Sequence, residues 1–341
     1  MKKIIFILFV ISLAGCAVLR DSLYQNTYIY VGSAVTLKTV QEDTAAMRVL
    51  LSDFNSITAE NAMKMKSMFP QKDVINWKSA DEYVNFAKKN NMRIHGHALL
   101  WHESVPEWLN EYANDHDAFD GIVTNYIHNY VEHYKNEVAG WDVVNEAISD
   151  SAGLFRKTLF YRVLGESYIE KAFRAANEAN ANALLFYNEY GIENDSVKLN
   201  AMLKMVDNLT AKNVPIHGIG MQMHITTDMD VQMFKRALHE IIKRGLLIHI
   251  SELDVRVNQD NRYKRFNHNA AKQQKDMYYT VVKTYLDIVP RNQQYGVTLW
   301  GYSDAYSWIP HYFKTQDWPC IYDEKMKRKP AYNGMWKAFS E

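Results

Sequence analysis

The sequence predicts an α/β protein that folds as a single-domain (β/α)8 TIM barrel. Short apolar runs alternate along the chain with longer segments of helical periodicity, and the apolar runs recur eight times. Runs rich in β-branched and aliphatic residues are typical of parallel strands that are buried on both faces. Eight such strands, each followed by a helix, close into a barrel.

The predicted elements follow in chain order. Residues 167–180 carry apolar side chains at helical spacing, from Tyr168 to Ala176, and residues 197–208 repeat that spacing from Leu199 to Val206. An open doubly wound sheet is the alternative, but no glycine-rich phosphate loop follows the first strand. The strand candidates are residues 28–34, 54–58, 93–100, 138–143, 183–187, 216–221, 247–251 and 295–299.

The composition favours one large domain and a neutral ligand. Lys plus Arg and Asp plus Glu are equal at 39 each, which argues against a nucleic-acid partner bound through its phosphates. No linker or low-complexity tract interrupts the chain, so we predict one catalytic domain over residues 26–341. Aromatic residues make up 13% of the chain, which suits sugar stacking and a large core equally well.

The N-terminus predicts export. Lys2 and Lys3 precede an apolar run over residues 4–13, which is typical of a signal peptide and too short for a membrane span. The following string LAGC resembles the lipobox of bacterial lipoproteins, which implies lipidation of Cys16. We therefore expect a signal peptide over residues 1–15, a tether over residues 16–25 and anchoring to a membrane, with Ala17 favouring the outer membrane. The alternative is an ordinary secretory signal peptide. If Cys16 is lipidated, Cys320 has no intramolecular partner.

Polar side chains gather directly after the predicted strands. From the second strand onwards, the strings are ITAENAMK, HGHALLWH, NEA, YNEYG, GMQMHI, SELD and LWGYSDAYSWIP. In a parallel barrel the C-terminal strand ends meet on one face, where barrel enzymes keep their active sites. A structural role would scatter polar groups over both ends, so we predict an active site on this face.

Two glutamates at strand ends are the leading catalytic candidates. Glu146 closes the apolar run within the string GWDVVNEA, and Glu252 follows the run LLIHIS. Cleavage of an acetal through an oxocarbenium-like transition state needs a protonated acid for the leaving oxygen and an ionised carboxylate on the other side. Two neighbouring acids titrate differently because each opposes the ionisation of the other. The pair predicts a glycosidase, and two unrelated surface glutamates are the alternative.

The chain resembles glycoside hydrolase family 10, the endo-β-1,4-xylanases, from about Asn26 to Trp336. The resemblance rests on FNSITAENAMK, RIHGHALLWH, WDVVNEAI, LLFYNEYGIE, GIGMQMHI, ISELDV and VTLWGYSDAYSWIP, in the order and spacing of the family. It implies hydrolysis of xylan with retention of configuration, with Glu146 as acid/base and Glu252 as nucleophile. No metal or organic cofactor is implied.

The resemblance also implies a set of residues that bind the substrate or support the catalytic pair. Asn145 matches a residue that hydrogen-bonds the sugar 2-hydroxyl, His224 one that contacts the nucleophile, and Asp254 its orienting carboxylate. Glu60, Asn61 and Lys64 match the group that grips the next sugar, although an ordinary first helical turn with a Glu60–Lys64 ion pair is an alternative. The remaining matches are Gln222 near the acid, His97 in the reacting subsite, Trp101, Trp300 and Trp308 as aromatic walls, and Tyr190 on the leaving-group side.

Some features depart from the family pattern or leave alternatives open. Glu103 and Ser104 follow His102 where the family often has serine or asparagine and then glutamine, and the family's frequent late disulfide is missing. Residues 256–274 are rich in Asn, Arg and Lys, and we expect a solvated loop. A glucanase on the same barrel and a glycan-binding lipoprotein without activity are the alternative functions, and Trp308 argues against the glucanase because it implies a wall too close for a hydroxymethyl group.

Overall fold

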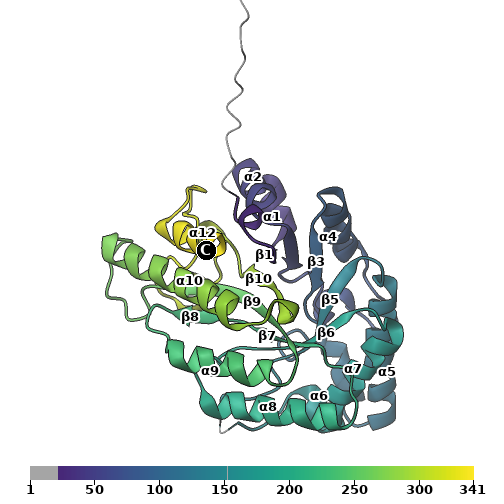
Figure 1. Cartoon of the computed structure of the whole chain (residues 1–341). Coiled ribbons are helices and arrows are strands. Elements are labelled where there is room, and N and C mark those ends of the chain that lie inside the picture. The colour runs from purple at the N-terminus through teal and green to yellow at the C-terminus, as the bar shows by residue number, and fades with distance from the viewer. Residues whose placement is uncertain (1–21, 152) are drawn as a thin grey trace, which may run out of the picture.

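The computed structural model describes residues 22–151 and 153–341, and the predicted signal peptide and Cys16 lie outside them. Within these residues eight parallel strands close into a barrel, which confirms the predicted fold (Figure 1). Their order is β10-β1-β2-β3-β5-β6-β7-β9, and pairing of β10 with β9 completes the circle. The strands are β1 (Tyr30–Val35), β2 (Ser56–Ala59), β3 (Arg93–Gly96), β5 (Val138–Asn145), β6 (Leu184–Glu189), β7 (Gly218–Met221), β9 (Leu247–Arg256) and β10 (Gln294–Leu299).

Two short strands extend the barrel at its C-terminal face. β4 (Leu100–Trp101) pairs with the end of β5, and β8 (His224–Thr226) pairs with the end of β9. The predicted strand over residues 93–100 is therefore two strands, and the chain passes between them through a cis peptide bond from His97 to Ala98. Both extensions carry residues that the sequence assigned to the site.

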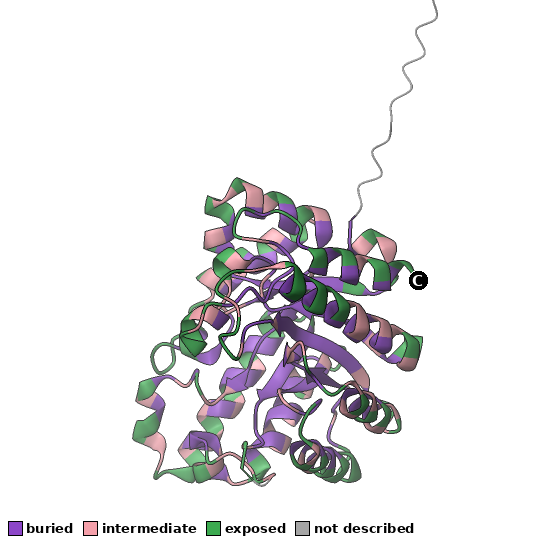
Figure 2. Cartoon of the chain, turned by 90° about the vertical axis from the view of Figure 1, so that its left-hand side faces the viewer, coloured by how far each residue is buried: buried purple, intermediate pink, exposed green. Residues whose placement is uncertain are grey.

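Helices surround the barrel and expose their outer faces, while the strands are buried (Figure 2). Several of them begin at an Asp, Asn or Thr side chain that accepts backbone N–H groups, as Asp195 and Asp230 do, and such caps satisfy donors that a helix start leaves unpaired. The helices are α1 (Leu37–Glu42), α2 (Thr44–Asp53), α3 (Met65–Met68), α4 (Lys78–Lys89), α5 (His116–His133), α6 (Leu159–Leu164), α7 (Ser167–Ala179), α8 (Ser196–Ala211), α9 (Val231–Ile242), α10 (His268–Ile288), α11 (Ile309–Phe313) and α12 (Pro330–Ser340), with 3₁₀ turns at Tyr24–Asn26, Glu107–Tyr112, Arg291–Gln293 and Asp304–Tyr306.

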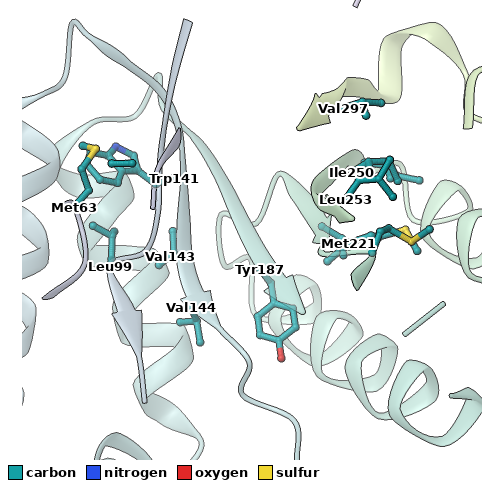
Figure 3. Packing of buried hydrophobic residues seen from close by; sticks show 14 of the residues in the cluster. Met63, Leu99, Trp141, Val143, Val144, Tyr187, Met221, Ile250, Leu253 and Val297 are labelled. Carbon is teal, nitrogen blue, oxygen red and sulfur yellow. The ribbon is translucent and has the colours of Figure 1, made fainter. Parts of the chain in front are cut away.

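One hydrophobic core fills the barrel and the space between strands and helices. Trp141, Tyr187, Met221, Ile250 and Val297 come from five different strands, and each is fully buried (Figure 3). Close packing of this kind fixes the positions of the strand ends. The residues at the C-terminal ends therefore project from a rigid frame.

Two segments differ from the expectations. The folded domain includes residues 22–25, which the sequence assigns to the tether. Ser22 and Leu23 are buried, and the Leu23 N–H donates to buried Asp53 at 3.2 Å.

The expected loop over residues 256–274 ends early, because α10 begins at His268 and Gln274 is buried. Gln274 donates to the carbonyls of Val255 and Trp318, so a polar residue here joins elements instead of facing solvent.

Among residues 22–151 and 153–341 no helix combines the length and the apolar character needed to cross a bilayer.

Candidate active site

Strand pairing brings the predicted site residues together on the C-terminal face of the barrel. Asn145 on β5 pairs with Asn188 on β6, and His224 on β8 pairs with Asp254 on β9. Parallel neighbours lie about 4.8 Å apart, so residues far apart in sequence become direct partners. Glu252 lies on β9, two residues before Asp254.

Glu252 is almost fully buried and is held by three side chains. Its Oε1 accepts a hydrogen bond from Asn188 Nδ2 at 2.6 Å and lies 4.0 Å from His97 Nδ1, and its Oε2 lies 3.3 Å from His224 Nε2. Burial opposes ionisation of Glu252, but the hydrogen bond from His224 and the proximity of His97 outweigh it and lower its pKa. The structure therefore holds Glu252 as a carboxylate.

His224 is bound on both ring nitrogens. Its Nδ1 lies 2.9 Å from Asp254 Oδ2, and its Nε2 faces Glu252. Burial opposes protonation of His224, but Asp254 and Glu252 outweigh it and raise its pKa to about 10. His224 is therefore an imidazolium that donates to both carboxylates. Trp308 Nε1 donates to the same Asp254 Oδ2 at 2.9 Å, so Trp308 and His224 bind the same carboxylate oxygen.

This ion pair predicts a pH-dependent stability. The pKa of His224 rises from 6.5 to about 10 on folding, so its contribution is complete below pH 6.5 and is lost as pH rises through 10. We expect the free energy of unfolding of the wild type to fall across this range more steeply than that of His224→Gln. Urea titrations at several pH values measure both slopes. His239→Gln, an exposed change on α9, is the control. Parallel curves for wild type and His224→Gln would contradict the prediction.

Glu146 follows β5 in a left-handed conformation, with φ of 59°. Its Oε1 accepts hydrogen bonds from Gln222 Nε2 at 3.0 Å and from Asn145 Nδ2 at 3.2 Å. Asn145 Oδ1 in turn accepts from Gln222 at 3.1 Å and from Asn188 at 2.9 Å. Because Asn188 also binds Glu252, a continuous chain of amide groups connects the two glutamates.

The strand β7 leaves room for this amide chain. A Cβ atom added to Gly220 would lie 2.0 Å from Asn188 Oδ1. Any larger residue would therefore displace Asn188 from both Asn145 and Glu252. The requirement for glycine arises from this close approach and not from an unusual backbone angle.

The side of the cleft formed by β2, β4 and β10 carries Lys64 between two tryptophans. Lys64 Nζ lies 4.3 Å from the ring centroid of Trp101 and 5.7 Å from that of Trp300, and it donates to Asn61 Oδ1 at 3.2 Å. Burial lowers the pKa of Lys64, although Glu252 and Glu60 oppose this effect. Glu60 pairs with Thr36 Oγ1 at 2.8 Å, not with Lys64, so the alternative of a simple helical ion pair is wrong.

A cavity of about 210 Å³ continues the cleft beyond Glu60. Thr36, Thr39, Ser303 and Tyr306 contribute hydroxyl groups to its lining. A volume below the usual range of drug-sized pockets suits a small polar group such as a single sugar ring.

Tyr190 lies on the opposite side of Glu146, within a polar cluster. Its hydroxyl donates to Asp150 at 2.6 Å and accepts from Arg156 at 2.9 Å. Lys198 Nζ lies 3.3 Å from the Tyr190 ring centroid and 2.9 Å from Asp150 Oδ1. Arg156 connects Tyr190 to the backbone carbonyl of Glu146, and the assignment of Tyr190 to the leaving-group side stays a prediction.

The structure adds functional residues that we did not assign from sequence. Asn188 and Glu189 lie in the quoted string YNEYG, but nothing in one sequence distinguishes their roles. Asp142 lies on β5, four residues before Glu146. It accepts a hydrogen bond from His97 Nδ1 at 2.8 Å, which orients the His97 ring. Ser104 stands where the family often has glutamine, and its carbonyl accepts a hydrogen bond from the Lys66 N–H at 2.9 Å, which joins the two segments.

Two further observations bear on metals and disulfides. In the described part of the chain no group of three or more His, Cys, Asp or Glu side chains is arranged to hold a metal ion. Cys320 is buried and free.

A parallel barrel with two buried carboxylates on its C-terminal face, joined by amides and lined by tryptophans, has the features of a glycoside hydrolase. The chain belongs to glycosyl hydrolase family 10, whose family model matches residues 19–338. This membership confirms the resemblance inferred from the seven sequence strings and the glycosidase class inferred from the glutamate pair.

Several relatives are similar along most of the chain. Endo-beta-1,4-xylanase Xyn10C of Cellvibrio japonicus is 38% identical over 309 residues, which is 84% of this chain and 51% of that protein. Endo-1,4-beta-xylanase B of Thermotoga neapolitana is 37% identical over 287 residues, covering 84% of this chain and 81% of that protein. The structure of xylanase 10C from C. japonicus in complex with xylopentaose matches with a TM-score of 0.90 and 34% identity, over 94% of this chain and 69% of that one. The chain thus spans about half the length of one curated relative and most of the other.

Proposed function

We propose that this protein is an endo-β-1,4-xylanase that hydrolyses internal bonds of xylan with retention of configuration. The observation that carries the proposal is the pair Glu146 and Glu252, buried on one face of the barrel and joined through Asn145, Asn188 and Gln222. The xylanase names of the relatives, and the xylopentaose in one related structure, support xylan as the substrate.

Glu252 serves as nucleophile in this proposal. Its ionised carboxylate attacks the anomeric carbon, the bond to the leaving oxygen breaks, and Glu146 transfers its proton to that oxygen. A water molecule then attacks the glycosyl-enzyme, gives its proton to Glu146 and releases the Glu252 carboxylate. His224 keeps Glu252 ionised and oriented, and Asn145 lies where it can bind the 2-hydroxyl of the reacting sugar, a contact that strengthens in the transition state.

Substrate recognition uses the two walls of the cleft. Glu60, Asn61 and Lys64 bind hydroxyl groups of the second sugar, and Trp101 and Trp300 present apolar ring faces for stacking. His97, held by Asp142, contacts the sugar in the reacting subsite.

Trp308 provides the selection of xylose over glucose. The indole packs edge-on against His224, with ring centroids 4.9 Å apart, and its Nε1 is fixed by Asp254. A wall held at two points cannot move aside easily for the hydroxymethyl group of glucose. This rigidity favours xylan over the glucan alternative.

Product analysis tests the proposal. The purified domain should release short xylo-oligosaccharides from xylan, and NMR should detect the β-anomer first. Cellulose and mixed-linkage glucan, assayed in parallel, should be poor substrates. Cleavage of glucan alone would overturn the role of Trp308, first appearance of the α-anomer would overturn retention, and no cleavage of any polymer would favour a glycan-binding protein.

We also propose that the protein is exported and anchored to a membrane, with the outer membrane favoured by Ala17. The support comes from the sequence: Lys2, Lys3, the apolar run and the LAGC string that ends in Cys16. Incorporation of a labelled fatty acid that disappears in Cys16→Ala would support the anchor, and unlabelled wild-type protein would contradict it.

A further inference from the structure

The acid Glu146 occupies a backbone conformation that its own residue type does not favour. A non-glycine residue with a φ of 59° is uncommon and persists only where the surroundings hold it. The Glu146 N–H donates to the Asn188 carbonyl at 2.9 Å, which fixes the start of the turn. The groups that hold the peptide bonds after Glu146 therefore decide where its carboxyl group points.

Two buried side chains of β6 hold these following peptide bonds. The Tyr187 hydroxyl accepts from the N–H groups of Ala147 at 2.9 Å and Ile148 at 3.3 Å. The same hydroxyl donates to Glu189 Oε2 at 2.5 Å, and the Ile148 N–H also donates to that oxygen at 3.2 Å. Glu189 thus fixes both Tyr187 and the backbone after the acid.

The second carboxylate oxygen of Glu189, Oε1, also has partners. It is fully buried, and Glu189 Oε1 accepts from the Tyr190 N–H at 3.1 Å and pairs with Lys198 Nζ at 3.1 Å. Burial raises the pKa of Glu189 to about 7, although Lys198 opposes this effect. A buried carboxylate with partners on both oxygens defines one geometry for the groups that it binds.

The opposite side of the same turn is fixed by Arg156. Its Nε donates to the Glu146 carbonyl at 3.1 Å, and its backbone N–H donates to the Ala147 carbonyl at 2.7 Å. Arg156 also contacts the Tyr190 hydroxyl, which connects this side to the residue after Glu189. The turn that carries the acid is therefore clamped between β6 and Arg156.

Side chains on the two faces of β6 support different members of the glutamate pair. Successive side chains of a strand point to opposite faces, so Tyr187 and Glu189 share one face and Asn188 takes the other. Asn188 binds Glu252, whereas Tyr187 and Glu189 bind the segment after Glu146. Three consecutive residues thus support both members of the pair.

We infer that Glu189, acting through Tyr187, is a positioning residue that aims the carboxyl group of Glu146 at the leaving oxygen. The inference rests on the proposed role of Glu146 as general acid. It extends that role to two buried residues that cannot contact the substrate.

The dependence on the leaving group separates positioning from structural damage. A sugar leaving group needs a proton from the acid, whereas dinitrophenolate leaves without one, so a misplaced acid slows only the first reaction. The test compares kcat/KM on xylotetraose with kcat/KM on 2,4-dinitrophenyl β-xylobioside for Glu189→Gln and Tyr187→Phe. The value on xylotetraose should fall about 10- to 100-fold, as expected for an acid displaced by a fraction of an ångström to one ångström. The value on the aryl substrate should stay close to that of the wild type.

Tyr285→Phe is the matched control. Tyr285 is a buried tyrosine whose hydroxyl donates to the Ile248 carbonyl at 2.8 Å, away from the acid, so its loss should leave the ratio of the two substrates unchanged. If Glu189→Gln does not fold, Tyr187→Phe, which keeps the aromatic ring in the core, provides the same comparison.

Equal losses on both substrates, or no loss on either, would overturn the positioning role. Failure of the wild type on xylotetraose would instead refute the proposed function. The two failures are therefore distinguishable in one set of assays.

Discussion

Replacement of Glu252 with glutamine should abolish hydrolysis of xylan, with a loss in kcat on the order of 10⁵-fold or more, as is typical when a catalytic nucleophile is removed. Glutamine keeps the size of the side chain and can still accept the hydrogen bond from Asn188, but its amide cannot form the glycosyl-enzyme. Affinity for xylo-oligosaccharides should survive, because the residues that grip the second sugar are unchanged. Chromatography of the products and calorimetric titration with xylotetraose measure the two quantities.

Glu178→Gln is the control for this variant. Glu178 is exposed on α7, far in sequence from both strands of the site, and its replacement should leave hydrolysis unchanged. Hydrolysis by Glu252→Gln at a rate within tenfold of the wild type would refute the role of nucleophile. Circular dichroism would show whether the variant folds. Loss of folding together with binding would mean that the buried contact between Glu252 and His224 is a structural requirement.

Replacement of Glu146 with alanine should produce the second-largest effect, and one that depends on the leaving group. General acid catalysis contributes about 10²- to 10⁴-fold, so kcat/KM on xylotetraose should fall by that factor. The value on 2,4-dinitrophenyl β-xylobioside should change little, since that leaving group needs no proton. Added azide should raise turnover of the aryl substrate and give the β-xylobiosyl azide, because a small anion can enter the space left by the carboxyl group and attack the glycosyl-enzyme.

The two variants act as controls for each other. Glu252→Gln should fail on both substrates and should not respond to azide by forming the β-product, whereas Glu146→Ala should fail on one. Equal losses by Glu146→Ala on both substrates would contradict its role as acid. Because the same two substrates are used, the smaller loss of kcat/KM expected for Glu189→Gln can be compared directly with that of Glu146→Ala.

The two glutamates differ in how they are held. Glu252 lies within β9 and depends on side chains: Asn188, His224 and, through His224, Asp254. Glu146 lies just beyond β5 on a left-handed turn, and its carboxyl group accepts hydrogen bonds from Gln222 and Asn145. The nucleophile must keep one charge state and one direction, and the acid must exchange a proton in each half of the reaction. The position of Glu252 within a strand, beside the imidazolium of His224, suits a residue that stays ionised. The position of Glu146 at a strand end suits a residue that exchanges a proton.

The sequence alone predicted the fold class and the number of barrel strands, which the structure confirms, and it proposed Glu146 and Glu252 as the catalytic pair. These features are local: apolar runs reveal buried strands, helical spacing reveals the segments between them, and polar strings follow the strands at one end. The first residues of all eight barrel strands lie within two residues of the predicted ones, as for β3 at Arg93 and β9 at Leu247. The family resemblance added the roles of residues in those strings.

Only the tertiary structure decided which of these residues meet. The amide chain from Glu146 to Glu252 joins residues at the ends of four strands, and the Trp308 bond to Asp254 spans 54 residues. The role of Glu189, the space beside Gly220 and the burial of Leu23 and Gln274 have no local signal. Hydrophobic periodicity reports which face of an element is buried, but hydrogen bonds between distant side chains depend on register and barrel closure, which are set when all eight strands have paired.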